Sequence, residues 1–399
     1  MSRWLPRLKG LGVVALLGIA AIVAPAVRAD DAVVEPRGTG VVPLRSDDVE
    51  MVAERVDVYL YQNWAYVEAV FTLRNTGPAA ELLVGFPEEH SPEGDRPGNL
   101  AEPRIRDFTA QVDGSPLPVA YRPGLASAAL PGLEIAGWHT FVVPFAAGQT
   151  RTVKHTYLLR STRYSNDVTH FGYLLRTGAL WKGPIGRADV LVHASGGLRA
   201  GDLELLRGAY GPATSPRPSR DHVVEGGVVA WHLDNLEPGP DDDVLVAVSP
   251  PADRPIVQIS PARARPGEKV RYTVTARGPQ EPWPAGSRVV LYAGQERRRV
   301  AESVLASPDI QAFGEFVLPA GLTPTRGRAA EVWAEHEPSG ARAPSTLIYV
   351  EGAPERLPAA GGLPADTLAV PVGLAALCLV AIGATALLKI ETGKASRGL

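Results

Sequence analysis

Apolar and polar residues alternate along most of the chain between Val49 and Val350, and Gly, Pro, Asn and Asp break the alternation at short intervals. A period of two places successive side chains on opposite faces of a β-strand. No stretch in this span has the 3.6-residue period of an amphipathic helix. We therefore predict an all-β protein built from antiparallel β-sandwich domains.

The clearest unit is VDVYLYQNWAYVEAVFTLRNTG, residues 56–77. It predicts two strands joined by a reversal at Gln62 and Asn63. The residues expected to face the core are Val56, Val58, Leu60, Ala65, Val67, Ala69, Phe71 and Leu73. The dipeptide Asp113-Gly114 predicts a second hairpin, and residues 138–159 predict a third that turns at 146–148.

A Pro-rich segment, SPPADRP at 249–255, divides the chain into two predicted domains. The first is an all-β exported domain at 45–250, and the alternation leaves open whether it is one large sandwich or two small ones. The second spans 255–351 and holds about seven short strands, which is typical of an immunoglobulin-like β-sandwich.

The first 29 residues have the features of a secretory signal peptide. Arg3, Arg7 and Lys9 precede an apolar run, and the small residue Ala29 ends it before Asp30. We predict cleavage after Ala29; an uncleaved membrane helix is the alternative.

The other end predicts a membrane anchor. Residues 368–388 carry no charge, and a helix of about 20 residues spans about 30 Å of hydrocarbon. The tail at 389–399 is basic, so it is expected in the cytoplasm, with the rest of the chain on the extracellular side. The membrane is therefore a predicted partner, and the predicted location is the cell membrane or the cell wall.

Composition excludes several classes of function. The net charge is −3 and no basic, aromatic surface is evident, so we expect no nucleic-acid partner. The single cysteine, Cys378, lies in the predicted membrane helix, so the exported part has no disulfide, cysteine nucleophile or cysteine metal ligand.

Catalytic motifs are also missing from the sequence. It contains no nucleophile elbow, phosphate-binding loop or His-Glu-x-x-His motif, so we predict no catalytic residue and no cofactor. A pair of carboxylates is defined by its separation in space and stays open. Six tryptophans follow the leader and are expected to anchor the core, with Trp181 the least certain of them.

Two histidines are the candidate metal ligands. If the hairpin at 138–159 turns at Ala147, His139 faces His155 across the ladder with Cβ atoms about 5 Å apart. Zinc needs at least one more protein ligand, and the sequence places none nearby, so we predict no metal site. The acidic segments 87–99 and 241–243 lack the ligand spacing of a calcium loop and are interpreted as solvated loop charge.

Segments of both predicted domains resemble known families. GWHTFVVPFAAGQTRTVKHTYLL and YLLRTGALWKGPIGRADVLV, in the first domain, are similar to a family of exported bacterial β-rich domains of unknown function. ARPGEKVRYTV, PAGSRVVLY and GEFVLPAGLTPTRGRAAEVWAEH, followed by STLIYV, resemble bacterial immunoglobulin-like modules. These resemblances imply an exported bacterial protein and carry over no site residues.

The hexapeptide LPAAGG, residues 357–362, lies in a Pro/Ala/Gly linker at 352–367. With the apolar span and basic tail it resembles the LPXTG-like wall-sorting signal of Gram-positive surface proteins. The resemblance implies that sortase recognises Leu357 and Pro358, cleaves between Ala360 and Gly361, and joins the chain to the cell wall. Ala360 stands where that pattern has Thr, and the alternative is a stalk above a permanent membrane anchor.

These observations together predict a surface-anchored, non-enzymatic protein that binds an extracellular protein or glycan or contributes to the cell envelope. The alternative is an extracytoplasmic enzyme or metal-dependent protein that uses a carboxylate pair or His139 and His155.

Overall fold

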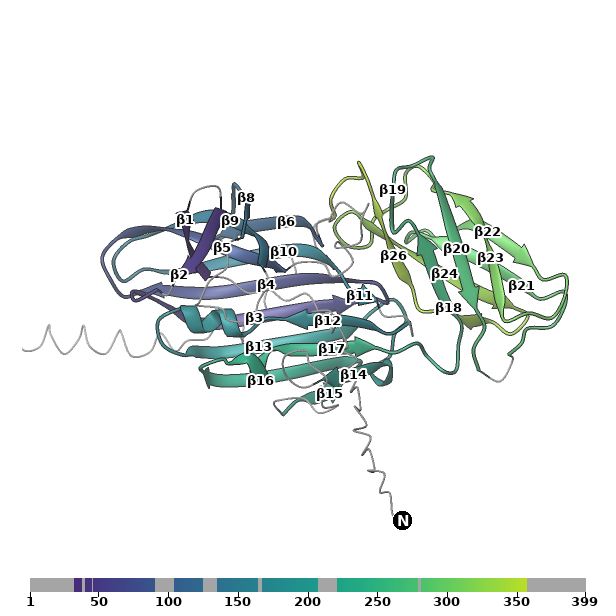
Figure 1. Ribbon diagram of the computed structural model, residues 1–399, viewed down its shortest axis with the longest axis horizontal. Coiled ribbons are helices and arrows are strands. Elements are labelled where there is room, and N and C mark those ends of the chain that lie inside the picture. The colour runs from purple at the N-terminus through teal and green to yellow at the C-terminus, as the bar shows by residue number, and fades with distance from the viewer. Residues whose placement is uncertain are drawn as a thin grey trace, which may run out of the picture. The chain divides into compact units, whose positions relative to one another are not determined.

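The computed structural model describes residues 32–37, 40–44, 46–89, 104–124, 135–163, 167–206, 221–278 and 281–356. These residues are nearly all β, which confirms the predicted class (Figure 1). Their helical turns are η1 (Arg176–Leu180), η2 (Ala200–Asp202) and η3 (Pro240–Asp242). No helix among them has the length and apolar character needed to cross a membrane. The predicted signal peptide, most of the linker, the helix at 368–388 and the tail lie outside the described residues.

The N-terminal β-region, which ends at Val248, contains three sheets (Figure 1). The five-stranded sheet comprises, in spatial order, β2 (Gly40–Leu44), β1 (Ala32–Arg37), β5 (Ala80–Glu89), β9 (Ile135–Phe145) and β8 (Ala120–Pro123). The eight-stranded sheet comprises β15 (Val223–Glu225), β16 (Val228–Leu236), β13 (Ile185–Ala194), β3 (Val49–Leu60), β4 (Trp64–Asn75), β10 (Thr150–Arg160), β6 (Ile105–Val112) and β7 (Ser115–Leu117). The four-stranded sheet comprises β11 (Thr162–Arg163), β12 (Thr169–Tyr173), β17 (Val244–Val248) and β14 (Leu203–Leu206).

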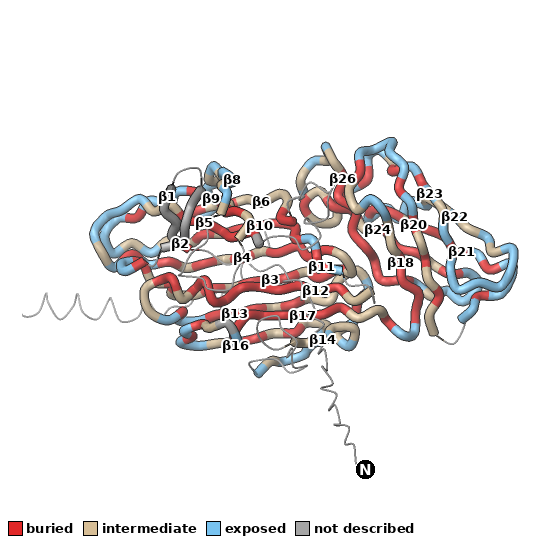
Figure 2. The backbone as a smooth tube through the Cα atoms, viewed as in Figure 1, coloured by how far each residue is buried: buried red, intermediate tan, exposed pale blue. Residues whose placement is uncertain are grey.

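These three sheets share one apolar core. Buried residues recur along β3, β4 and β13 of the eight-stranded sheet (Figure 2). They form a single cluster with Phe86 and Phe141 of the five-stranded sheet and with Tyr173 and Val246 of the four-stranded sheet. Both smaller sheets therefore bury their apolar faces in the same core as the large sheet.

The β3–β4 hairpin forms as the alternation predicts. All eight residues expected to face the core are buried, and the two strands pair from Val49 with Asn75 to Leu60 with Ala65. The Asp113-Gly114 turn is also confirmed, because it joins β6 to β7. Asp113 and Gly114 have φ of 49° and 81°, and a type I′ hairpin turn requires positive φ at both central residues.

The third predicted hairpin is wrong. β9 pairs with β5 and β8, whereas β10 pairs with β4 and β6, so the chain passes from one sheet to another at Ala146–Gln149. The pairing of His139 with His155 across one ladder therefore does not exist. The physical reason is that both strands present an apolar face, which suits two facing sheets as well as one hairpin.

The C-terminal β-region begins at Ile256 and contains two sheets. The three-stranded sheet comprises β18 (Ile256–Ser260), β20 (Lys269–Thr275) and β23 (Gln311–Val317). The larger sheet comprises β19 (Arg263–Ala264), β26 (Thr346–Val350), β24 (Ala329–Glu337), β21 (Arg288–Ala293) and β22 (Arg298–Val304), with β25 (Ala341–Arg342) paired to β24. Both sheets contribute to a second apolar cluster that includes Tyr272 and Trp283.

The two β-regions belong to one compact unit and contact each other directly. Tyr61, Trp64 and Leu158 of the first region cluster with Leu347 and Tyr349 of the second. Separately, the side chain of Asp107 accepts hydrogen bonds from Arg328 Nη1 at 3.0 Å and from the Tyr349 hydroxyl at 2.7 Å. An apolar contact and a charged contact therefore both join the regions.

Two expectations about single residues have clear outcomes. All six tryptophans after the leader are buried, including Trp181, which is fully buried. The interpretation of the acidic segments 87–99 and 241–243 as solvated charge is wrong for Glu88, Asp242 and Asp243, which are buried; Asp243 is 1% exposed. Its carboxylate accepts hydrogen bonds from the backbone N–H groups of Leu175 and Arg176 and pairs with the Arg176 guanidinium, and these contacts offset the cost of burying the charge.

Candidate functional site

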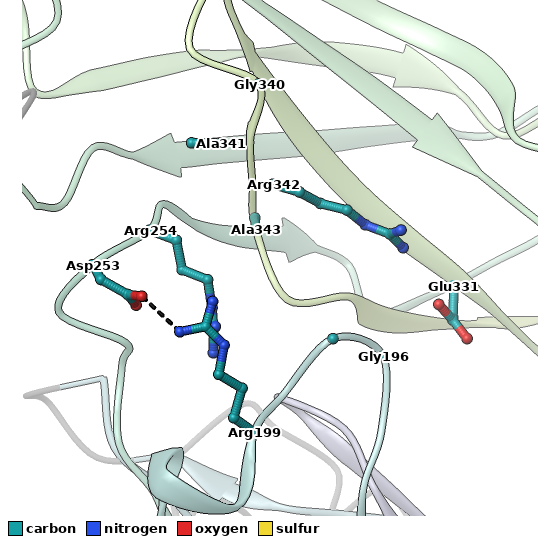
Figure 3. Close-up of a pocket in the computed structure, with 10 residues that line it drawn as sticks. Gly196, Arg199, Asp253, Arg254, Glu331, Gly340, Ala341, Arg342 and Ala343 are labelled. Atoms are coloured by element: carbon teal, nitrogen blue, oxygen red, sulfur yellow. Dashed lines mark hydrogen bonds and ion pairs between the residues drawn. The ribbon is translucent and has the colours of Figure 1, made fainter. Parts of the chain in front are cut away.

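A pocket of about 630 Å³ is lined by residues of both β-regions (Figure 3). We call it the junction pocket. Its small lining residues are Gly196, Gly197, Gly340, Ala341 and Ala343. Its charged lining residues are Arg199, Asp253, Arg254, Glu331 and Arg342.

Glycine at 196 allows the two walls of the pocket to approach. Gly196 follows β13 and has a φ of 63°. A Cβ atom there would lie 2.8 Å from Tyr61 Cδ1 and 3.0 Å from Ser345 Cβ. Its carbonyl oxygen instead accepts a hydrogen bond of 2.6 Å from the backbone N–H of Ser345. A larger residue would push the β13 loop away from the segment before β26.

Asp202 holds two arginines of the pocket. Its Oδ2 accepts a hydrogen bond of 2.7 Å from the backbone N–H of Arg199 and also pairs with Arg254 Nη2. The Arg254 side chain is only 8% exposed, and its buried Nε has no hydrogen-bond acceptor among the described residues. Arg254 is thus a nearly buried cation with one carboxylate partner.

Arg199 is fixed by a second carboxylate. Its Nη1 lies 2.7 Å from Asp253 Oδ2, and this hydrogen bond lowers the pKa of Asp253. In Figure 3 the side chains of Arg199 and Arg254 extend toward each other, from two segments that lie on the same side of the pocket and across from Arg342 and Glu331. Two guanidinium groups therefore converge on one wall.

Arg342 and Glu331 form the other wall. The Arg342 guanidinium carbon lies 4.6 Å from the centre of the Trp333 ring, which is a cation–π contact. Arg342 has no ion pair with a carboxylate of the described residues. Glu331 accepts a hydrogen bond of 2.8 Å from the Ser345 hydroxyl. A smaller cavity of about 220 Å³ shares Glu331 and Arg342 with the junction pocket.

The predicted metal candidates lie elsewhere, in the core between the five-stranded and eight-stranded sheets. The Phe108 ring is stacked on His139 at 4.7 Å and lies 5.1 Å from His155. His139 Nε2 lies 3.2 Å from Glu88 Oε2, and Glu88 Oε1 accepts a hydrogen bond from the backbone N–H of Arg104. The two histidines thus share a core but belong to facing sheets.

Metal-ligand geometry is not present in the described part of the chain: no three His, Cys, Asp or Glu side chains there are placed to hold an ion. The residues of the sorting motif, Leu357, Pro358, Ala360 and Gly361, lie outside the described residues.

Sequence reasoning missed the junction pocket. Its charged residues are separated by up to about 140 positions, and only the contact between the two β-regions brings them together. The sequence offered one signal, which is that Arg254 lies in the Pro-rich segment interpreted as a domain boundary. The structure shows that this arginine is buried rather than solvated. An arginine in so short a connection between two domains can have partners in both.

Comparison with known proteins leaves the family unidentified. No family model matches the chain, and no curated protein matches its sequence. Among solved structures, the chain is similar to a Legionella pneumophila protein described as a "putative nutrient binding protein". The TM-score is 0.43 with 19% identity, over 55% of this chain and 73% of that one.

Proposed function

We propose that this chain is a non-enzymatic extracytoplasmic binding protein that uses the junction pocket as its ligand site. The observation that carries the proposal is the pocket itself. Its volume falls in the range of about 300–1,000 Å³ that is usual for ligand sites. The nearly buried Arg254 side chain is held by Asp202, and Arg342 is oriented by its cation–π contact with Trp333, so these two groups need little ordering when a ligand binds.

The C-terminal β-region is proposed to be an immunoglobulin-like module. Its two sheets, its separate apolar cluster and the parallel pairing of β19 with β26 support this assignment. In this proposal the module supplies one wall of the pocket and also links the N-terminal β-region to the C-terminal anchor.

Surface anchoring is part of the proposal and is supported by the sequence. The apolar leader, the uncharged span at 368–388 and the basic tail indicate export and retention at the membrane, and LPAAGG indicates transfer to the wall as the alternative.

The binding function is tested by blocking the pocket in the purified full-length chain. Ala341 lines the pocket and is partly exposed, so Ala341→Phe should obstruct it without disturbing either core. Ala80→Phe, at an exposed position of β5, is the matched control. In a thermal-shift screen of small extracellular metabolites and glycan fragments, we expect a ligand that raises the melting temperature of the native chain and the control but not of Ala341→Phe.

A hit that stabilises Ala341→Phe as well as the native chain would place the binding site elsewhere. A screen in which no compound distinguishes Ala341→Phe from Ala80→Phe would contradict the proposed function.

The enzymatic alternative has one observation in its favour. The contact between His139 and the buried Glu88 is an arrangement that can orient an imidazole for acid–base chemistry. Elemental analysis of the purified chain and an assay for substrate turnover test this alternative. A stoichiometric transition metal that is lost in His139→Ala would favour it over the binding function.

A further inference from the structure

We infer that the junction pocket takes a ligand with an anionic group, a carboxylate or a phosphate, held between Arg342 on one wall and Arg199 and Arg254 on the other. This inference rests on the proposed function and adds the chemical class of the ligand.

The first argument is the charge of the lining. The lining holds three guanidinium groups and two carboxylates, so its formal charge is positive. Asp253 already pairs with Arg199, and Glu331 already accepts a hydrogen bond from Ser345. A wholly cationic ligand would therefore find a carboxylate without an arginine partner among the described residues only at Glu331, and it would be repelled by the three arginines.

The second argument is the state of Arg342. It is exposed to solvent, it contacts the face of Trp333, and it forms no ion pair with a carboxylate of the described residues. Stacking on the ring orients the guanidinium, and its N–H donors have no hydrogen-bond acceptor among the described residues. A planar fork of donors matches carboxylate and phosphate oxygens, which is the usual role of an arginine held in this way.

The third argument is the construction of the opposite wall. Asp202 ties the backbone of Arg199 to the side chain of Arg254, and the Arg254 side chain is more than nine-tenths buried. Burying a guanidinium is costly, and a single carboxylate offsets only part of that cost. Among the described residues the buried Nε of Arg254 also has no acceptor, and an anion in the pocket would supply one.

Glu331 restricts which anions fit. Its carboxylate lies in the same pocket as the arginines, so an anionic group placed beside Glu331 would be repelled, whereas an anionic group bound at the arginines would not. A ligand that presents its anionic group to the arginines and a hydroxyl or ammonium group to Glu331 would match both walls. Hydroxy acids and phosphorylated or acidic metabolites have this character.

The test is calorimetric titration of the purified full-length chain with four probes: inorganic phosphate, citrate, glucose and spermidine. We expect phosphate or citrate to bind, glucose and spermidine to bind at least tenfold more weakly, and added salt to weaken the binding of the anion. Comparing phosphate with citrate tells which anionic group the pocket prefers. Tighter binding of phosphate would indicate a phosphate ligand, and tighter binding of citrate would indicate a carboxylate ligand.

Arg342→Gln is the decisive variant, because Arg342 is exposed and its loss leaves both cores intact. We expect it to weaken anion binding by roughly tenfold to a hundredfold, as befits the loss of a charge-assisted hydrogen bond. Arg271→Gln removes the same charge at an exposed position of β20 and should leave the affinity unchanged. Equal losses in the two variants would mean adventitious surface binding and would overturn the inference.

The remaining outcomes separate the inference from the proposed function. If glucose or spermidine binds more tightly than either anion, and Ala341→Phe abolishes that binding, the pocket is a ligand site but the inferred ligand class is wrong. If neither these probes nor the screened metabolites distinguish Ala341→Phe from Ala80→Phe, both are wrong.

Discussion

The carboxyl group of Glu54 is buried in the core of the N-terminal β-region. Its Oε1 accepts a hydrogen bond of 2.7 Å from the Tyr173 hydroxyl, and its Oε2 is buried without a partner among the described residues. Burial raises the pKa of Glu54 from 4.5 to about 7, and the hydrogen bond from Tyr173 opposes this rise. Near neutral pH this side chain therefore titrates inside the core.

The raised pKa predicts that stability falls as the pH rises. Between about pH 4.5 and 7 the folded state retains a proton on Glu54 that the unfolded state has lost. The Glu54 contribution to the free energy of unfolding should therefore be fully present below pH 4.5 and decrease by up to about 3 kcal/mol as the pH rises past 7. Urea denaturation of Glu54→Gln should lack this decrease. Parallel pH profiles of the variant and the native chain would contradict the prediction.

Burial of His155 predicts the opposite pH dependence of stability, a loss of stability as the pH falls. The imidazole lies among the rings of Phe71, Phe86, Phe108 and Phe141. Burial, with a smaller effect of nearby His139, lowers the pKa of His155 from 6.5 to about 3. As the pH falls below 6.5, the unfolded state takes up a proton that the folded state does not accept until about pH 3.

The free energy of unfolding should accordingly decrease by as much as about 4 kcal/mol between pH 6.5 and 3 because of His155 alone. Replacement His155→Phe keeps an aromatic ring in the cluster and removes the titrating group. Thermal melts of the two proteins at pH 7 and about pH 4 measure the effect. A variant that loses as much stability on acidification as the native chain would show that other groups dominate.

At the scale of elements, the turn between β3 and β4 is built to pair with β26. The Asn63 Nδ2 donates to the Leu347 carbonyl oxygen at 2.9 Å, and the Leu347 N–H donates to Asn63 Oδ1 at 2.7 Å. The side-chain amide thus makes the same pair of hydrogen bonds as a neighbouring strand would. This turn therefore contributes directly to the contact between the two β-regions.

Asn63→Ala should lower the free energy of unfolding by about 1–3 kcal/mol, because two backbone groups of Leu347 lose their partner. The neighbouring Gln62→Ala removes a side chain of similar size from the same turn and is the control. Chemical denaturation of both variants measures the difference. Equal stability of the two would mean that water replaces the Asn63 amide at no cost.

The elements also show what the sequence could and could not predict. The β3–β4 hairpin was predictable because eight apolar positions alternate on either side of a short polar reversal. The β9–β10 pairing failed although the same two signals are present, since alternation shows that a strand has an apolar face but not which sheet it joins. Partners that are distant in sequence, such as β5 for β9, leave no local mark.

The junction pocket was unpredictable for the same reason. Arg199 pairs with Asp253 at the surface, whereas Arg254 is nearly buried and pairs with Asp202. The fold, rather than the local sequence, brings each arginine to its partner. Asp243 was misjudged in the same way, because its run of acidic residues resembles solvated charge unless Arg176 is known to face it. Charged side chains become functional or structural through tertiary contacts that composition does not encode.

At the scale of the whole molecule, the last prediction concerns the termini of the native protein. We expect an N-terminus at Asp30, because the leader ends in a small residue that a signal peptidase accepts. We expect the chain to reach Leu399 in the detergent-extracted fraction, because Ala360 lacks the hydroxyl of the Thr in the sorting pattern. Mass spectrometry of material released by detergent and, separately, by a wall-digesting enzyme measures both ends.

A chain that ends at Ala360 and carries a wall fragment would instead establish LPAAGG as a sorting signal. In that case Pro358→Ala should move the protein from the wall fraction to the membrane fraction, whereas Pro364→Ala, in the neighbouring LPADT, should leave it in the wall. A chain that retains Met1 and is recovered without detergent or wall digestion would contradict surface anchoring. The junction pocket would then meet intracellular rather than extracellular ligands, so this measurement also decides which metabolites belong in the binding screen.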